Sequence, residues 1–142
     1  MRFWDTSALV PLLLEQPATT RVRDLLVQDP EIVAWWGTPV ECASAAARLR
    51  REERLSAVEE SRVLDLLTHL RESWLEVLPS QEVRTRALRL LRVHSLKAAD
   101  AMQLAAARVW AGDHGAAAFV TLDERLALTA RLEGFRVLPD AG

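Results

Sequence analysis

Residues 2–7, Arg2-Phe3-Trp4-Asp5-Thr6-Ser7, place an aspartate and two hydroxyl residues directly after a short apolar run. Residues 118–123, Ala-Phe-Val-Thr-Leu-Asp, also end an apolar run with an aspartate, near the other end of the chain. Short apolar runs of this kind are typical of buried strands, and both are predicted as strands here. Because helical spacings lie between such runs, the sequence predicts an α/β fold in which strands alternate with helices.

Outward from these two stretches, the alternation continues along the whole chain. The predicted strands are Arg2–Trp4, Ile32–Trp36, Trp74–Leu78, Ala117–Leu122 and Phe135–Leu138. The predicted helices are Ser7–Glu15 with Pro11 in its first turn, Thr19–Val27, Thr38–Glu53, Ser56 to about Leu70 with a capping box through Glu59, Gln81–Val93, Lys97–Trp110 and Glu124–Glu133. The length of 142 residues fits one domain, residues 1–142. Strands joined through helices pair in parallel, so we expect a small, mainly parallel sheet with helices on both faces.

The composition excludes several classes of protein. The net charge of −2 and the pI of about 5.9 do not suit a protein that coats nucleic acid through general charge. Binding to RNA or DNA would therefore need a local basic patch or bound metal ions. The single cysteine, Cys42, excludes an intrachain disulfide and a cysteine metal cluster. No apolar run suits a membrane span and no signal-peptide core is present at the N-terminus, so we expect a cytoplasmic protein.

Four acidic residues stand at the predicted strand ends and helix starts. Asp5 and Asp123 each follow a strand, so both should emerge at the carboxyl edge of a parallel sheet. Glu41 lies in the first turn of the helix that follows the strand ending at Trp36. Asp100 lies in the first turn of the helix that begins at about residue 97. Ligands bind beyond the carboxyl ends of strands in open α/β sheets, so we expect these four carboxylates to meet in one crevice.

Carboxylates gathered in this way favour a divalent cation. Two like charges at ~4 Å repel by about 4 kcal/mol at an effective dielectric near 20. A bound cation relieves the repulsion, and oxygen-only ligands suit hard ions such as Mg²⁺ or Mn²⁺. One or two such ions activate water against a phosphodiester and stabilise the leaving oxygen. The pattern therefore predicts phosphodiester hydrolysis.

Each of the four acids also has a purely local explanation. Glu41 completes a capping box with Thr38, with proline at the first helical position, and taken alone this explanation is the stronger one. Asp123 is equally well explained as the N-cap of the following helix, and Asp100 as a complement to the dipole of its own helix. Asp5 could belong to a turn, but the serine two positions later already serves as a cap there. The joint placement of the four acids favours the shared site.

Four stretches in this order resemble the successive motifs of PIN-domain nucleases. They are Trp4–Leu9, Thr38–Glu41, Leu96–Ala105 and Phe119–Asp123, and the closing strand Gly134–Leu138 extends the resemblance over nearly the whole chain. Stand-alone domains of this length are similar to the VapC-type toxins of prokaryotic toxin–antitoxin pairs. The resemblance implies an α/β/α sandwich that cleaves RNA with Mg²⁺ or Mn²⁺, forms a homodimer and is blocked by a cognate antitoxin.

The same resemblance implies roles for individual residues. Asp5 and Asp100 would be the principal metal ligands. Glu41 and Asp123 would complete the catalytic acidic site, directly or through water. Three hydroxyl residues would orient the acids: Thr6 or Ser7 beside Asp5, and Thr121 beside Asp123. At Gln103 many relatives carry a histidine, and the amide that replaces it here cannot act as an acid or a base.

Other features leave alternatives open. Arg48 and Arg51 belong to an arginine cluster that suits a solvated helix end, and contact with the RNA backbone is the sharper hypothesis for both. A phosphatase or phosphoacceptor domain could use Asp5 as a nucleophile or acceptor. The phosphatase would, however, need a second aspartate where Ser7 stands, and the phosphoacceptor would need a lysine after a later strand. A PIN-like fold kept as a binding module is the non-enzymatic alternative, and the intact acids argue against it.

Overall fold

Strands and helices alternate in the computed structural model, which describes residues 1–112 and 116–140. The strands in these residues are β1 Arg2–Trp4, β2 Ile32–Trp35, β3 Leu75–Val77, β4 Ala118–Val120 and β5 Arg136–Leu138. The helices are α1 Thr6–Leu13, α2 Thr19–Gln28, α3 Thr38–Arg51, α4 Ala57–Arg71, α5 Gln81–Val93, α6 Ala98–Ala111 and α7 Glu124–Leu132. Among the described residues, every helix is too short or too polar to span a lipid bilayer.

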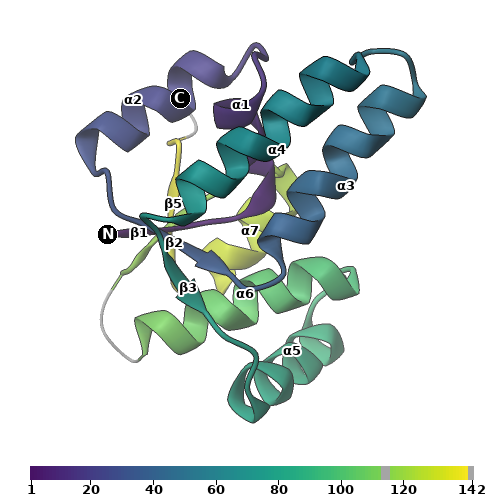
Figure 1. Ribbon diagram of the computed structural model, residues 1–142. Coiled ribbons are helices and arrows are strands. Elements are labelled where there is room, and N and C mark those ends of the chain that lie inside the picture. The colour runs from purple at the N-terminus through teal and green to yellow at the C-terminus, as the bar shows by residue number, and fades with distance from the viewer. Residues whose placement is uncertain (113–115, 141–142) are drawn as a thin grey trace.

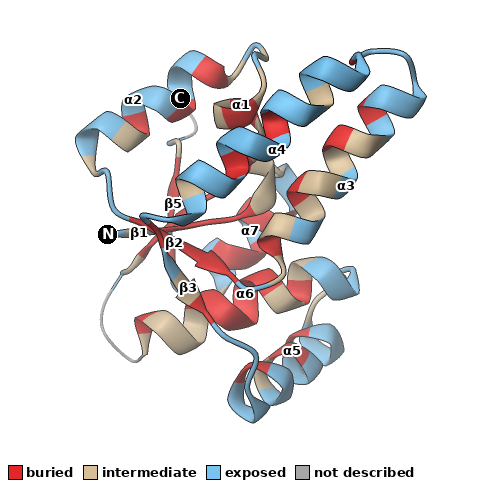
Figure 2. Ribbon diagram, viewed as in Figure 1, coloured by how far each residue is buried: buried red, intermediate tan, exposed pale blue. Residues whose placement is uncertain are grey.

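The strands form one five-stranded sheet in the order β3-β2-β1-β4-β5, and every pair is parallel (Figure 1). Helices α1 to α4 cover one face, and α5, α6 and α7 cover the other. The predicted small parallel sheet between two helical layers is therefore confirmed. The strands are short, with three or four residues each, and Figure 2 shows them largely buried.

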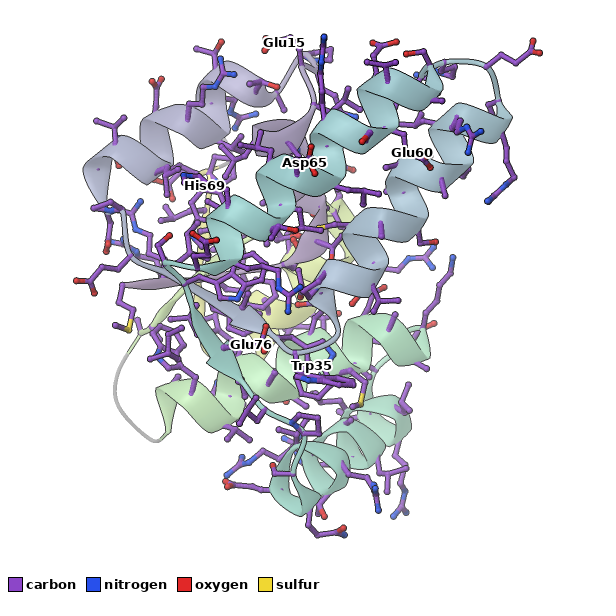
Figure 3. The ribbon with its side chains drawn as sticks, in the orientation of Figure 1. Glu15, Trp35, Glu60, Asp65, His69 and Glu76 are labelled. Carbon is purple, nitrogen blue, oxygen red and sulfur yellow. The ribbon has the colours of Figure 1, made fainter. Side chains whose placement is uncertain are left out.

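Alternate side chains of each strand enter opposite halves of the core, as the two-residue period of a strand requires. Phe3 and Phe119 stack at 5.5 Å between ring centroids on the side of α5 and α6. Their neighbours Trp4 and Val120 pack against the opposite helices. Trp35 lies on the α5 side of β2, as Figure 3 shows. The apolar runs therefore form strands because both of their faces are buried.

The strand order reverses between β1 and β4, and this reversal positions the site. The chain builds β1, β2 and β3 in one direction and then returns to place β4 on the other side of β1. After β1 the chain enters α1 on one face, whereas after β4 it enters α7 on the opposite face. Divergence of this kind opens a crevice at the carboxyl ends of the two strands, where α/β proteins bind ligands.

The N-cap residues of two helices differ from the sequence prediction. Helix α1 begins at Thr6 instead of Ser7, because Asp5 has extended backbone and occupies the N-cap position. Pro11 is consequently inside the helix, beyond its first turn. Helix α3 follows an N-cap at Gly37, so Thr38 belongs to the helix and does not cap it. The predicted capping box of α4 is confirmed, with both of its reciprocal hydrogen bonds formed.

Candidate acidic site

Asp5 lies at the end of β1, and hydroxyl groups from two segments surround it. The Ser7 hydroxyl donates to Asp5 Oδ1 over 2.7 Å and lies 3.2 Å from the Thr121 hydroxyl. The backbone N–H of Leu122 donates to the same Ser7 oxygen over 2.9 Å. The prediction that Ser7 caps α1 is therefore wrong. Ser7 instead joins Asp5 to the segment that follows β4. Asp5 is fixed in the gap between the two central strands.

Burial dominates the electrostatics of Asp5, whose side chain is 96 % removed from solvent (4 % exposed). Its pKa is raised from 3.8 to about 7, mainly by desolvation, and hydrogen bonds from the hydroxyls of Ser7 and Thr121 offset only part of the effect of burial. The charges of Asp100 and Asp123 raise the pKa further. A carboxyl group in this environment resists ionisation near neutral pH unless a positive charge accompanies it.

Glu41 contacts a buried amide instead of its own helix start. Gln103, which is 1 % exposed, donates from Nε2 to Glu41 Oε2 over 2.9 Å and to the Thr38 hydroxyl over 2.9 Å. The same nitrogen lies 3.1 Å from the Thr6 hydroxyl. The capping box predicted for Thr38 and Glu41 is therefore wrong, because both side chains turn toward α6. Thr6, expected beside Asp5, contacts this amide instead.

Gln103 is the residue whose importance the sequence analysis missed. Its amide links α1, α3 and α6, and it is the polar residue in an alanine-rich stretch of α6, residues 101–107. It stands three positions after Asp100, so it lies on a neighbouring part of the same helix surface. The three-residue spacing from Asp100 was the feature of the sequence that could have indicated a place for Gln103 near the acidic site. Its Oε1 atom is buried and has no hydrogen-bond partner in residues 1–112 and 116–140.

Asp100 lies in the first turn of α6, half-buried, and its charge affects two of the other acids. Burial raises its pKa, the charge of Asp123 raises it further, and Lys97 and Arg125 act in the opposite direction. The charge of Asp100 in turn raises the pKa of Asp5 and of Glu41, in both cases after the larger effect of burial. Asp100 is thus close enough to the other acids to repel them.

Asp123 caps helix α7, which is the local explanation that the sequence offered for it. Its Oδ1 atom accepts a hydrogen bond from the Leu126 N–H over 2.9 Å, so it is the N-cap of α7. Its own N–H donates to the Thr121 hydroxyl over 3.1 Å. Asp123 also lines a cavity of about 500 Å³ between α2, α7 and β5. The cap engages one carboxylate oxygen and leaves the other available.

The charges of the four predicted acids act on one another in pairs: Asp100 and Asp123 raise the pKa of Asp5, Asp123 raises that of Asp100, and Asp100 raises that of Glu41. Among the described residues, however, no three acidic, histidine or cysteine side chains lie close enough together to coordinate one ion. The donors are all carboxylate oxygens, the donor type that Mg²⁺ and Mn²⁺ prefer. Their mutual repulsion and the raised pKa of Asp5 are the features that a divalent cation would relieve. By this test the residues fit such an ion.

The two arginines predicted to contact RNA lie apart from the acids. Arg48 and Arg51 are exposed in the last turn of α3. Arg48 follows Glu41 by seven residues, which is about 10 Å along a helix axis. The structure therefore does not bring these arginines into the crevice, and contact with RNA at this distance stays a prediction.

These features define a class of protein: a three-layer α/β domain with coupled carboxylates at the point where the order of its parallel strands reverses. The sequence pattern of the PIN domain matches residues 2–132 of this chain. The chain belongs to the PIN domain family. The resemblance stated from the motifs is thereby confirmed. No curated protein sequence is similar enough to the chain to count as a match.

Solved structures share the fold at low sequence identity. A sarcin–ricin-loop-cleaving toxin of Mycobacterium tuberculosis, VapC20, superimposes with a TM-score of 0.70 at 15% identity over 96% of this chain and 97% of that one. The FitAcB structure from Neisseria gonorrhoeae gives 0.67 at 18% identity over 96% of each chain. A toxin–antitoxin complex from Klebsiella pneumoniae gives 0.62 at 19% identity over 89% of this chain and 91% of that one. At these identities the likeness establishes the fold.

Proposed function

We propose that this chain is an endoribonuclease that depends on Mg²⁺ or Mn²⁺ and acts as the toxin of a toxin–antitoxin pair in the cytoplasm. One observation carries the proposal: Asp5 is buried at the end of β1, next to the segment that follows β4, and the charges of Asp100 and Asp123 raise its pKa. Asp100 acts in the same way on Glu41. Membership of the PIN domain family and the fold shared with toxins, one of which cleaves RNA, support it.

Asp5 and Asp100 would be the principal ligands of the cation, and Glu41 and Asp123 would complete the site. When bound, the cation supplies a Lewis acid for phosphodiester hydrolysis and a lowered pKa for the attacking water. Hydrolysis adds the water oxygen to phosphorus, breaks the bond to the leaving oxygen and moves one proton to that oxygen.

The surrounding side chains hold the acids in position for this reaction. Ser7 fixes Asp5 through a hydrogen bond of 2.7 Å, and Thr121 lies beside both. Gln103 holds Glu41 through a hydrogen bond of 2.9 Å from α6. Supports of this kind set the orientation and basicity of metal ligands.

The deciding experiment incubates the protein with total RNA and Mn²⁺ and maps the ends that appear. Cleavage should stop when a chelator is added and in Asp5→Asn and Asp100→Asn. Asp65→Asn is the matched control, because Asp65 is exposed on α4 and removes the same charge from a surface helix (Figure 3). Cleavage that survives in both site variants would refute the assignment.

The toxin role and the partners require separate tests. Expression of the wild type should arrest growth, whereas Asp5→Asn should be tolerated, and equal growth of the two strains would count against a toxin. A homodimer should have a mass of about 32 kDa by light scattering, twice the 15.9 kDa of the chain. The product of a neighbouring open reading frame, as antitoxin, should copurify with the chain and suppress RNA cleavage.

A further inference from the structure

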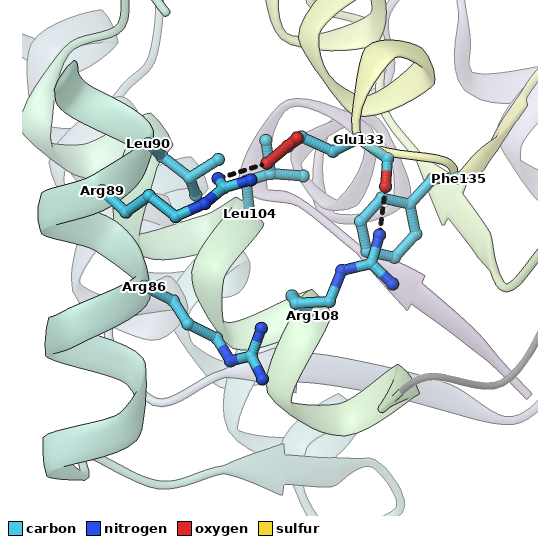
Figure 4. Close-up of a pocket in the computed structure, with 7 residues that line it drawn as sticks. All are labelled: Arg86, Arg89, Leu90, Leu104, Arg108, Glu133 and Phe135. Atoms are coloured by element: carbon cyan, nitrogen blue, oxygen red, sulfur yellow. Dashed lines mark hydrogen bonds and ion pairs between the residues drawn. The ribbon is translucent and has the colours of Figure 1, made fainter. Parts of the chain in front are cut away.

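A second cavity lies on the far side of the molecule from α3, between α5, α6 and the end of α7 (Figure 4). Its volume is about 390 Å³, and its apolar floor includes Leu90 and Leu104. Three arginines line it: Arg86 and Arg89 from α5 and Arg108 from α6. Arg108 follows Asp100 by eight residues, or about 12 Å along the helix axis, so this arginine pocket is distinct from the acidic site.

The charges of the arginine pocket do not balance. Glu133 is the acidic residue among those lining it, and its carboxylate is already engaged by Arg89 at 2.8 Å and by His94 at 3.7 Å. Burial acts to raise the pKa of Glu133, but these two partners outweigh burial and hold it below the usual value. Glu133 is therefore ionised and paired with Arg89. Among the described residues that line the pocket, no second carboxylate is present for Arg86 and Arg108.

Arg108 is held in place by uncharged partners in residues 1–112 and 116–140. Its guanidinium donates to the backbone carbonyls of Gly112 and Glu133 and lies 4.3 Å from the centre of the Phe135 ring. Carbonyl and ring partners carry no formal charge. A guanidinium fixed in this way loses little conformational freedom when it binds an anion, which favours binding.

Arg86 has the weakest structural role of the three. Its hydrogen bonds within the described residues go to Glu82 on its own helix, at 3.4 Å, in an exposed pair. Exposed pairs of this kind contribute little to stability. Figure 4 shows Arg86 extending from α5 toward α6, whereas the guanidinium of Arg108 turns toward Glu133 and Phe135. Unlike Arg89 and Arg108, which join helices, Arg86 therefore reaches into the pocket without stabilising the fold.

We propose that the arginine pocket binds a phosphate group. Planar guanidinium groups suit phosphate oxygens because they donate two parallel hydrogen bonds, and two arginines that line one cavity complement the charge of a phosphate. The phosphate could come from an RNA strand that continues away from the acidic site, and this source rests on the proposed function. A small phosphate-bearing molecule is the other source, and it is independent of that function.

The test measures binding of two probes to the full-length chain in the presence of a chelator, so that no RNA cleavage is required. Inorganic pyrophosphate is titrated by calorimetry, and a labelled single-stranded RNA is titrated by fluorescence anisotropy. Arg86→Gln is the test variant. Arg84→Gln is its matched control, because Arg84 is exposed on the same helix outside the lining residues and its loss changes the net charge equally.

We expect Arg86→Gln to weaken binding about tenfold, as the loss of one charge-assisted hydrogen bond predicts, while Arg84→Gln matches the wild type. Weaker binding of both probes identifies the RNA backbone as a source of the phosphate. A loss for pyrophosphate alone identifies a small ligand. Equal affinity of the wild type and Arg86→Gln for both probes, or an equal loss in the two variants, would overturn the proposal.

This result is separable from the proposed function. A chain that fails to cleave RNA with Mn²⁺ but binds pyrophosphate through Arg86 would retain the arginine pocket and lose the nuclease assignment. A chain that cleaves RNA but shows no difference between the two arginine variants would retain the nuclease assignment and lose the arginine pocket. Unfolding curves of both variants establish that the fold is intact before binding is compared.

Discussion

Asp5→Asn should stabilise the metal-free protein at alkaline pH, although it is expected to abolish RNA cleavage. Asp5 is buried beside two other acids, so its ionised form has a high free energy in the folded chain. Asparagine keeps the shape of the side chain and an oxygen that can accept the Ser7 hydrogen bond, but it carries no charge. The substitution therefore removes the cost of ionising Asp5.

The magnitude follows from the pKa of Asp5. A folded pKa raised above the unfolded value stabilises the protein fully below the unfolded pKa near 3.8, and this stability is lost as pH rises through about 7. The two values differ by roughly three units, and at about 1.4 kcal/mol per unit the loss is at most about 4 kcal/mol by pH 8. No discount for solvent screening applies, because the side chain is almost completely buried.

Urea unfolding in the presence of a chelator measures this difference. The advantage of Asp5→Asn over the wild type in free energy of unfolding should grow from pH 5 to pH 8. Excess Mn²⁺ should reverse this advantage, because the wild type is expected to bind the cation in its folded state and Asp5→Asn is not. Asp65→Asn should follow the wild type at both pH values. An Asp5→Asn variant that is no more stable than the wild type at pH 8 without metal would refute this account of Asp5.

Three other predictions concern the supports of the site and the fold. Gln103→Ala should lower the rate of RNA cleavage roughly 10- to 100-fold, because Glu41 loses the amide that orients it, and cleavage kinetics measure this loss. Ser56→Ala should cost about 1 kcal/mol in free energy of unfolding without affecting cleavage, because it removes the N-cap of α4. Cys42, whose pKa burial raises to about 12, should react with iodoacetamide at pH 8 only after unfolding, as mass spectrometry would show.

Each of these three has a distinct contrary result. Full activity in Gln103→Ala would mean that Glu41 needs no support from α6. A loss of cleavage in folded Ser56→Ala would connect α4 to the site, which no contact described above explains. Rapid alkylation of Cys42 in the native protein would contradict its burial.

The positions of the strands could be predicted because their signal is local. Phe3 and Phe119 belong to short apolar runs whose two faces are both buried, and such runs identify central strands without knowledge of the fold. The placement of Asp5 and Asp123 at one edge followed from parallel pairing alone. The N-cap role of Asp123 was one of two explanations that the sequence left open, because a helix begins one residue later.

The surroundings of Glu41 could not be predicted in this way. Its spacing from Thr38 favours a capping box, but the side chains of both contact Gln103, more than 60 positions further along the chain. This contact depends on how α3 packs near α6, which no local spacing encodes. The arginine pocket escaped the sequence analysis for the same reason, because Arg86 and Arg108 belong to different helices.

Binding of Mn²⁺, followed by electron paramagnetic resonance, tests the central claim most directly because it requires neither substrate nor partner. The account predicts that the wild type and Asp65→Asn bind the ion, and that Asp5→Asn and Asp100→Asn lose measurable binding while remaining folded. Equal Mn²⁺ binding by all four proteins, or none by the wild type, would contradict it.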